Sequence, residues 1–332
     1  MSETRFDVLG IGNAIFDILG HISDATLTEN GLVKGSMRLV SAEEALAVDA
    51  LLRDAVRISG GSAGNTVAGV ASLGGNAAFI GKVATDEFGD AYRSDMHRIG
   101  IEFRTPPLDG GAPTATSVIL VTPDGERTMN TFLGASQLLT VDDIDLDLVD
   151  ASAITFLEGY LFDPDAAKAA FRVAAERASA SGRIAALTLS DSFCIERHRA
   201  DFRQWLQSGQ IKLLFANIAE ARALMETDDV DAAASAMGEL VPTVVMTMGS
   251  EGARVISDGE VVDVPAAKTD VVDLTGAGDL FAGGFMMGHA RGLPPGECAR
   301  LGALAAAEVI SHFGARPQTE LSALAGKAGF SL

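Results

Sequence analysis

The chain has 332 residues, of which 48% are hydrophobic, and it carries a formal net charge of −20. This length allows one large α/β domain or two domains, and the hydrophobic content suffices for a sizeable buried core. The acidic charge argues against nucleic acid and anionic membranes as partners, because neither polyanion would be attracted. A phosphate site in this protein would have to be built locally, from backbone N–H groups and a few cations.

Cysteine usage and the N-terminus indicate the compartment. Cys194 and Cys298 lie in unrelated sequence contexts, so the chain has neither a disulfide framework nor a zinc-binding spacing. Residues Met1–Arg5 run directly into a strand-like segment without a signal peptide, which predicts a cytoplasmic protein. The uncharged span Ile58–Gly81 is rich in glycine and poor in large apolar residues, so it is not predicted to cross a membrane.

The first half of the chain mixes short apolar runs with helix-compatible segments. Phe6–Ile11 is predicted to be a buried strand. Ser41 and Glu44 form a Ser-x-x-Glu capping box that starts a helix ending near Arg53. Further predicted elements are a helix over Ser62–Leu73, a strand over Ala77–Ile80, a helix over Glu87–Ile99, and a β-hairpin made of Thr114–Val121 and Arg127–Phe132.

From residue 154 onward, strands alternate with helices. The predicted strands are Ile154–Leu157, Ile184–Leu189, Lys212–Phe215 and Val244–Met248, and the predicted helices include Pro164–Ala180, Leu280–Ala290 and Pro295–Ser311. This alternation with apolar strands predicts a parallel sheet covered by helices on both faces. Two segments, about residues 16–40 and 103–132, break the rhythm and are predicted to form a small separate β-sheet.

The segment Asp273–Asp279 has the sequence Asp-Leu-Thr-Gly-Ala-Gly-Asp and precedes an apolar, helix-compatible run. Such a turn would leave the backbone N–H groups of Gly276, Ala277 and Gly278 free at the positive end of a helix, where they form an anion hole. An aspartate at the mouth of an anion hole repels a phosphate. Asp279 makes chemical sense there as the base that takes a proton from a hydroxyl attacking that phosphate.

Three further motifs accompany this one, in a fixed order along the chain. They are Asn13-Ala14-Ile15-Phe16-Asp17 after the first strand, Ser59-Gly60-Gly61-Ser62-Ala63-Gly64-Asn65 before a helix, and Asn217-Ile218-Ala219-Glu220 in the second half. The set resembles the PfkB family of carbohydrate and nucleoside kinases over about residues 6–317. The resemblance implies an α/β, ribokinase-like, three-layer αβα fold with a mostly parallel central sheet and a β lid.

The implied organisation is a single kinase domain over residues 1–332. Its α/β core would comprise about residues 1–15, 41–102 and 133–332, and its lid about residues 16–40 and 103–132. The resemblance also implies ATP as phosphoryl donor and Mg²⁺ as cofactor.

The resemblance assigns the catalytic and nucleotide-binding residues. Asp279 would be the base, and Gly276, Ala277 and Gly278 would bind the transferred phosphoryl group. Leu274 departs from the commoner threonine. Glu220 would organise Mg²⁺ through water, and Asp273 would help to bind a monovalent cation such as K⁺. The implied nucleotide-binding residues are Asn217, Thr247, Gly249, Gly252, Thr275, Gly278 and Ser311.

The acceptor would be bound at the other end of the chain. Asp17 can accept hydrogen bonds from two vicinal hydroxyls, and an asparagine both donates and accepts. Arg127, on the lid hairpin, matches an arginine that reaches the transferred phosphate in the nucleoside-kinase branch. The implied substrate-binding residues are Asn13, Asp17, Gly61, Ser62, Gly64, Asn65, Arg127 and Leu161.

The identity of the acceptor stays open between two chemistries. The apolar residues Ile15, Met37, Leu39, Phe132, Leu161 and Phe193 favour a dry slot for a purine, as in adenosine kinase. The alternative is a free sugar such as ribose, fructose or 2-keto-3-deoxygluconate, and a different class is a nucleoside- or ATP-binding sensor without turnover. The sequence lacks a P-loop motif, and Ile15 interrupts a dinucleotide fingerprint. Monomer and homodimer are both compatible with the sequence.

Overall fold

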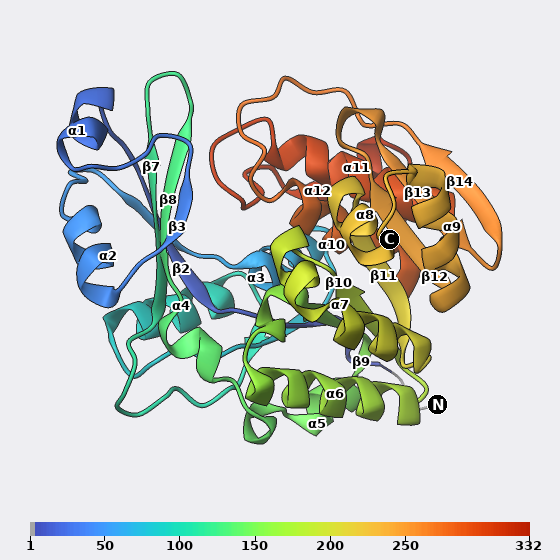
Figure 1. The fold of residues 1–332 in the computed structure, drawn as a ribbon. Helices are drawn as coiled ribbons and strands as arrows, with labels where there is room; N and C mark the ends of the chain where they lie inside the picture. The colour runs from blue at the N-terminus through green and yellow to red at the C-terminus, as the bar shows by residue number, and fades with distance from the viewer. Residues whose placement is uncertain (1–3) are drawn as a thin grey trace.

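A computed structural model describes residues 4–332, and two β-sheets organise it (Figure 1). The large sheet has nine strands in the order β14-β13-β12-β11-β10-β9-β1-β5-β6. In that order they span Glu260–Val264, Ala253–Ser257, Thr243–Thr247, Ile211–Asn217, Ile184–Thr188, Ser152–Glu158, Phe6–Ile11, Ala77–Ile80 and Glu102–Phe103. The strands from β12 to β6 are parallel, and β13 and β14 add an antiparallel edge. The predicted mostly parallel sheet is confirmed.

Helices cover both faces of the large sheet because its central strands are largely apolar and buried. The helices are α3 (Ser62–Ser72), α4 (Glu87–Arg98), α5 (Leu146–Asp150), α6 (Asp165–Ala180), α7 (Ser192–Gln207), α8 (Ile218–Met225), α9 (Val230–Leu240), α10 (Ala277–Ala290), α11 (Pro295–Val309) and α12 (Leu321–Lys327). One hydrophobic core includes side chains of α3, α4, α10, α11 and α12. The second core includes those of α5 to α9. The result is the predicted three-layer arrangement.

The second sheet has five strands in the order β3-β8-β7-β2-β4 and forms the lid. In that order they span Met37–Leu39, Arg127–Phe132, Ala115–Val121, Ile15–His21 and Val56–Ser59. The predicted hairpin is confirmed as β7 and β8. Figure 1 shows this sheet beside the large one, together with α1 (Asp24–Glu29) and α2 (Ala42–Asp49).

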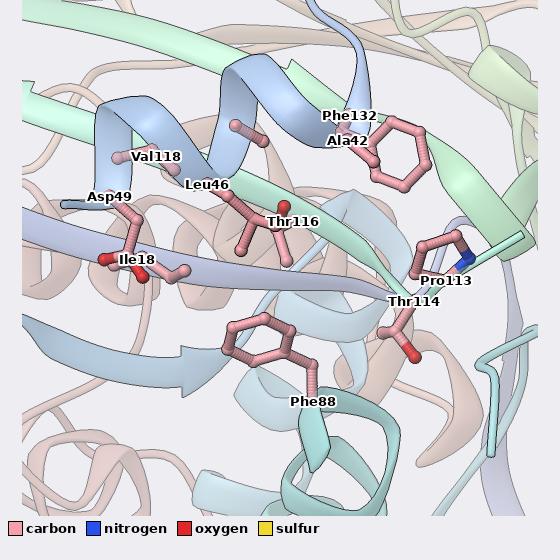
Figure 2. A pocket seen from close by; sticks show the side chains of 11 residues that line it. Ile18, Ala42, Leu46, Asp49, Phe88, Pro113, Thr114, Thr116, Val118 and Phe132 are labelled. Carbon is pink, nitrogen blue, oxygen red and sulfur yellow. The ribbon is translucent and has the colours of Figure 1, made fainter. Parts of the chain in front are cut away.

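The boundary between core and lid differs from the prediction at two places. The sequence analysis assigned residues 41–102 to the core, but β4 pairs with β2 in the lid sheet. In the same stretch α2 lies against β7 and β8 and closes a small apolar cavity lined by Leu46, Phe88 and Phe132 (Figure 2). Phe103, assigned to the lid, pairs with Phe79 at the edge of the large sheet. Local sequence does not reveal which sheet a short strand joins, because pairing partners are distant in the chain.

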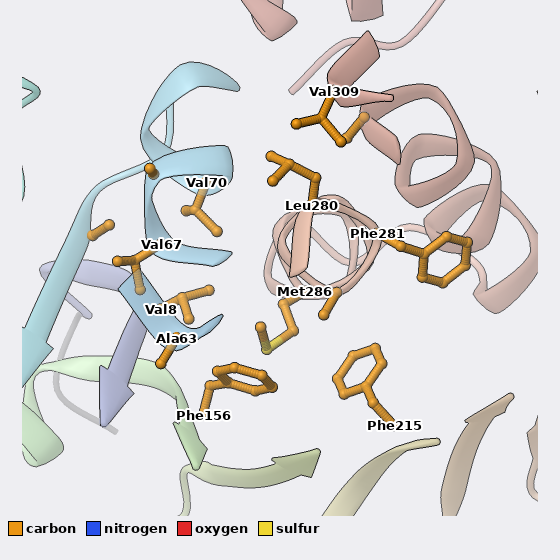
Figure 3. Close-up of a cluster of buried hydrophobic side chains, with 14 of the residues drawn as sticks. Val8, Ala63, Val67, Val70, Phe156, Phe215, Leu280, Phe281, Met286 and Val309 are labelled. Carbon is orange, nitrogen blue, oxygen red and sulfur yellow. The ribbon is translucent and has the colours of Figure 1, made fainter. Parts of the chain in front are cut away.

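Helix α10 is central to one core, where it packs against α3 and α11 (Figure 3). Leu280 and Met286 of α10 lie among Val67, Val70 and Phe156 from other elements. The close approach to α11 depends on Gly284, because a Cβ there would lie 2.8 Å from the α-carbon of Gly302. Small residues therefore set the position of the helix that carries Asp279.

We expect Gly284→Ala to destabilise the protein by about 1–3 kcal/mol, because the added methyl group would push α10 away from α11. Gly326→Ala in α12 is the matched control, since a Cβ there meets no atom within 4 Å. Removing this exposed helical glycine should be neutral or stabilise by up to about 1 kcal/mol. Urea unfolding midpoints of the two variants measure the difference. Equal midpoints would contradict tight packing at Gly284.

Candidate active site

The candidate site lies where the parallel strands of the large sheet end. Asn13 follows β1, Glu158 ends β9, Asn217 ends β11 and Thr247 ends β12. Asn217 and Thr247 are direct partners in the pairing of β11 with β12. Carboxyl ends of adjacent parallel strands share one edge, which is where ligands bind in open α/β sheets. The first turns of α3 and α10 meet at the same edge.

Asp279 lies in the first turn of α10 and is held by two side chains of α3. Its carboxylate accepts hydrogen bonds from Ser62 Oγ at 2.6 Å and from Asn65 Nδ2 at 3.0 Å. Burial raises the pKa of the Asp279 carboxyl, whereas these two hydrogen bonds and the positive charge of Arg316 lower it. The two hydrogen bonds therefore fix the carboxylate in orientation, and its raised pKa increases its affinity for a proton.

The turn before α10 presents backbone N–H groups to the site. Gly276 is the N-cap, with φ at 79°, and a Cβ there would lie 2.9 Å from Ala315 Cβ. Within residues 4–332, the N–H groups of Gly276 and Gly278 have no acceptor. The prediction was wrong for Ala277, whose N–H donates to the carbonyl of Leu274 at 3.3 Å because the turn closes on itself. Two of the three predicted donors thus remain free for an anion.

Two hydrogen-bond acceptors near Asp279 have no donor. Asp17 lies on β2, and no side chain or N–H within residues 4–332 donates to its carboxylate. Burial, reinforced by the charge of Asp279, raises the pKa of Asp17 to about 7. Asn65 Oδ1 is also buried without a partner, because the amide nitrogen is the atom that binds Asp279. A buried acceptor without a partner, such as Asn65 Oδ1, is costly, and the partly exposed carboxylate of Asp17 lies nearby, so the two together point to a hydroxyl-bearing ligand.

Asn13 and Leu161 do not occupy the predicted binding positions. The Asn13 amide is consumed inside the protein, since Nδ2 donates to Glu158 at 2.7 Å and Oδ1 accepts from Ser136 at 2.8 Å and Gln137 at 2.9 Å. Leu161 is 0% exposed and belongs to the second core. Leu161 therefore cannot contact an acceptor, and Asn13 holds the site together.

Glu158 is a buried residue of the site that the sequence analysis did not select. Its carboxylate accepts hydrogen bonds from the backbone and side chain of Asn13 and from the Ala63 N–H at 2.8 Å. Burial raises the pKa of Glu158 to about 7. Through its hydrogen bonds to Asn13 and Ala63, Glu158 ties the link between β1 and β2 to the start of α3. An acidic residue at the end of an otherwise apolar strand was the available signal.

The opposite edge of the site carries the predicted nucleotide residues. Asn217 caps α8 and forms a capping box with Glu220, whose two carboxylate oxygens accept from Asn217 N at 2.9 Å and Nδ2 at 2.7 Å. Burial and the nearby charge of Asp191 raise the pKa of Glu220 to about 7. Each oxygen keeps a free lone pair, so the residue fits a water-mediated contact with Mg²⁺. Thr247, Gly249 and Gly252 form the loop after β12.

Asp273, expected to help bind a monovalent cation, has one carboxylate oxygen that accepts from two donors and one that keeps a free lone pair, so this role stays a prediction. Its Oδ1 accepts from the Thr275 N–H at 3.0 Å, and its Oδ2 accepts from the Gly314 N–H at 2.9 Å and from Arg127. Both oxygens are thus engaged by donors. Ser311 is exposed, and its hydroxyl donates to the carbonyl of Glu308 at 2.6 Å.

Arg127 connects the lid to the turn before α10. Its guanidinium donates to Asp273 and to the Thr275 hydroxyl, and its centre lies 5.6 Å from the ring centroid of Phe313. His21, at the end of β2, contacts Phe313 edge-on at 5.5 Å. Burial lowers the pKa of Arg127 to about 10, which leaves it charged near neutral pH. Arg127 therefore places a positive charge from the lid at the turn before α10, which also carries the free N–H groups.

The lid face that carries Asp17 is largely apolar. Strand pairing places Asp17, Ser117, Thr131 and Leu39 in one row across the sheet, and Leu19, Ile119, Met129 and Met37 in the next. Met37 is 61% exposed and Leu39 is 63% exposed. Phe132 was assigned wrongly to this slot, because it lines the cavity under α2 on the opposite face (Figure 2).

Metal-binding and membrane features were searched over residues 4–332. No group of three or more histidine, cysteine, aspartate or glutamate side chains in that range is arranged to hold a metal ion. No helix in the same range has the length and apolar character needed to cross a membrane.

Comparisons with known proteins agree with this geometry. A family model described as pfkB family carbohydrate kinase matches residues 33–321. The solved adenosine kinase of Sinorhizobium meliloti is 48% identical with a TM-score of 0.91, over 98% of this chain and 100% of that one. A probable sugar kinase of Rhizobium etli is 44% identical with a TM-score of 0.91, over 98% and 99% of the two chains. Adenosine kinase 2 of Arabidopsis thaliana is 26% identical, over 94% of this chain and 96% of that protein.

We expect Arg127→Met to loosen the lid, because it removes the ion pair and hydrogen bond that join β8 to the turn before α10. Amide hydrogen exchange in β7 and β8 should accelerate at least about tenfold, which corresponds to about 1.4 kcal/mol of lost local stability. Lys34→Met is the matched control, since Lys34 pairs only with Asp24 and Asp124 of the lid. Similar exchange in both variants would show that the Arg127 contacts do not hold the lid.

Proposed function

Because the chain belongs to the pfkB family of carbohydrate kinases and is therefore a phosphotransferase, we propose that it transfers the γ-phosphoryl group of ATP to the 5′-hydroxyl of adenosine or a related ribonucleoside. One observation carries the proposal. The Asp279 carboxylate is held by Ser62 and Asn65 in the turn that carries the free N–H groups of Gly276 and Gly278, and the unpaired acceptors of Asn65 and Asp17 lie near it.

This arrangement supports base-assisted phosphoryl transfer. Asp279 would take the proton of the primary hydroxyl as that oxygen forms a bond to the γ-phosphorus and the bond to the β,γ-bridging oxygen breaks, releasing ADP. The N–H groups of Gly276 and Gly278 would donate to the phosphoryl oxygens, where negative charge develops. Arg127 would give up part of its contact with Asp273 and neutralise negative charge on the same phosphoryl oxygens. Bound Mg²⁺ would offset the charge of the ATP phosphates, and Glu220 would orient it through water.

The lid face favours a nucleoside as acceptor. Asp17 is the one carboxylate in the row of Ser117, Thr131 and Leu39, and it suits the two vicinal hydroxyls of a ribose. The exposed apolar side chains of Met37 and Leu39 lie next to it and suit a flat purine ring. The relative from Sinorhizobium meliloti, at 48% identity, is an adenosine kinase.

A free sugar is the second candidate, favoured by the 44% identity to a probable sugar kinase. An acceptor screen that couples ADP release to NADH oxidation separates the two. Adenosine should give turnover at least about a hundredfold above that of ribose, fructose and 2-keto-3-deoxygluconate in kcat/KM. Turnover with a sugar alone would leave the kinase assignment standing and refute the nucleoside. Binding of adenosine and ATP without ADP release would identify a sensor instead.

We expect Asp279→Asn to lower kcat by about 10²–10⁴-fold, because the amide keeps the size of the side chain but cannot accept the proton. The KM values and the unfolding temperature should stay near those of the wild type. Asp109→Asn, at an exposed position, serves as the control with unchanged turnover. A kcat near that of the wild type in Asp279→Asn would refute the assignment of the base.

We expect Asp17→Ala to raise the KM for adenosine at least about tenfold and to leave the KM for ATP unchanged. A hydrogen bond from a hydroxyl to a carboxylate contributes about 1.5–3 kcal/mol, and this variant removes it. For the wild type, 2′,3′-dideoxyadenosine should show the same loss, whereas for Asp17→Ala it should bind about as well as adenosine. A variant that weakens ATP and spares adenosine would show that the two sites are reversed.

A further inference from the structure

A partly buried arginine from the C-terminal part of the chain binds the segment that carries Gly60, Gly61 and Ser62. Arg316 follows α11, and its guanidinium is spent on the segment that leads into α3. Nε donates to the Ser59 carbonyl at 2.9 Å, Nη1 to the Gly64 carbonyl at 2.7 Å, and Nη2 to the Ser59 carbonyl at 2.8 Å and hydroxyl at 2.9 Å. The arginine thus clamps both ends of the turn that carries Gly60, Gly61 and Ser62.

These hydrogen bonds leave the positive charge of Arg316 without a directly paired carboxylate. No carboxylate oxygen within residues 4–332 lies within 4.0 Å of its nitrogens. Acidic groups nevertheless surround it: Asp17 on β2, Asp279 on α10, and Asp95 and Tyr92 on α4. Tyr92 donates to the Gly60 carbonyl, and Asp95 is neutralised by an ion pair with Arg98. The unneutralised acids near Arg316 are Asp17 and Asp279.

The same two carboxylates have few other cations to rely on. Arg127 acts on Asp17 from β8 but is paired with Asp273. Glu158, on β9, adds a further acid near Asp279. Two carboxylates in a partly desolvated site of an acidic protein repel each other, so a nearby positive charge favours the ionised form of both. A base that holds a proton cannot accept another.

We propose that Arg316 is a positioning residue whose charge favours the ionised forms of Asp17 and Asp279 and whose hydrogen bonds fix the turn before α3, which touches Asp17 at Gly60 and binds Asp279 through Ser62 and Asn65. The role of Asp279 as base rests on the proposed function, whereas the electrostatic role of Arg316 does not. The lone arginine in the segment Gly314-Ala315-Arg316-Pro317 gave no signal in the sequence, because its partners lie about 250 residues earlier in the chain.

The direct test is a pH titration of the aspartate carboxyl groups by ¹³C NMR, in protein labelled at the aspartate side-chain carbons. Asp17→Asn and Asp279→Asn assign the two signals. Arg316→Gln should raise the titration midpoints of Asp17 and Asp279 by about one pH unit or more, because a nearby opposite charge favours the ionised form. Arg300→Gln removes a surface arginine that pairs with Glu297 and should leave both midpoints unchanged. Unchanged midpoints in folded Arg316→Gln would overturn the proposal.

Kinetics provide the second measurement, with adenosine and MgATP as substrates, or with fructose if adenosine is not turned over. The acid limb of kcat/KM requires ionised carboxylates, so in Arg316→Gln it should move to higher pH by the same amount. Arg316→Lys keeps the positive charge but loses the planar guanidinium that binds Ser59 and Gly64. It should retain the wild-type acid limb within about half a pH unit while the acceptor KM rises several-fold.

Arg316→Lys also decides the matter if Arg316→Gln does not fold. A midpoint shift of about one unit in Arg316→Lys would show that the charge is not the operative property and would overturn the proposal. If neither acceptor is turned over by the wild type, the proposed function fails, while the NMR titration still tests Arg316.

Discussion

The site depends on one interaction, the grip of α3 on the carboxylate of Asp279. Ser62 and Asn65 lie more than 200 residues before Asp279, and their two hydrogen bonds join the first turns of α3 and α10. Those turns meet because α10 is wedged between α3 and α11 through close backbone contacts at Gly283 and Gly284. A shift of α10 would therefore move the base, the anion hole and the unpaired oxygen of Asn65 together.

Charge is the second constraint, because this protein collects buried acids at one place. Burial raises the pKa of Asp17, Glu158, Glu220 and Asp279, and an acidic surface supplies no general compensation. Positive charge near these acids is instead supplied by two arginines, and Arg127 reaches in from the lid. Arg316 binds the turn before α3. Each is held by hydrogen bonds that fix where its charge acts, which matters more in a desolvated site than the net charge of the chain.

The links between the two sheets are also tied at the site. Glu158 holds the connection between β1 and β2 to the start of α3, and Asn13 extends the network to Ser136 and Gln137 after β8. These hydrogen bonds connect the lid strands to the helix that holds Asp279. Arg127 makes the corresponding contact at the far end of the lid. The lid is thus coupled to the site at both ends.

The sequence by itself determined the layers of the fold, the hairpin of the lid, the capping box at Ser41, and the glycine-rich turn before Asp279, because periodicity, caps and turns are local properties. It also selected Asp279, Asp17 and Asn65. Only the tertiary structure decided which sheet β4 joins, that Leu161 and Phe132 face away from the slot, that Ala277 closes its own turn, and that Asp273 is occupied by Arg127. It alone brought Glu158 and Arg316 to the site. The reason is physical: burial, register and pairing depend on residues far apart in the chain, whose meeting no local pattern records.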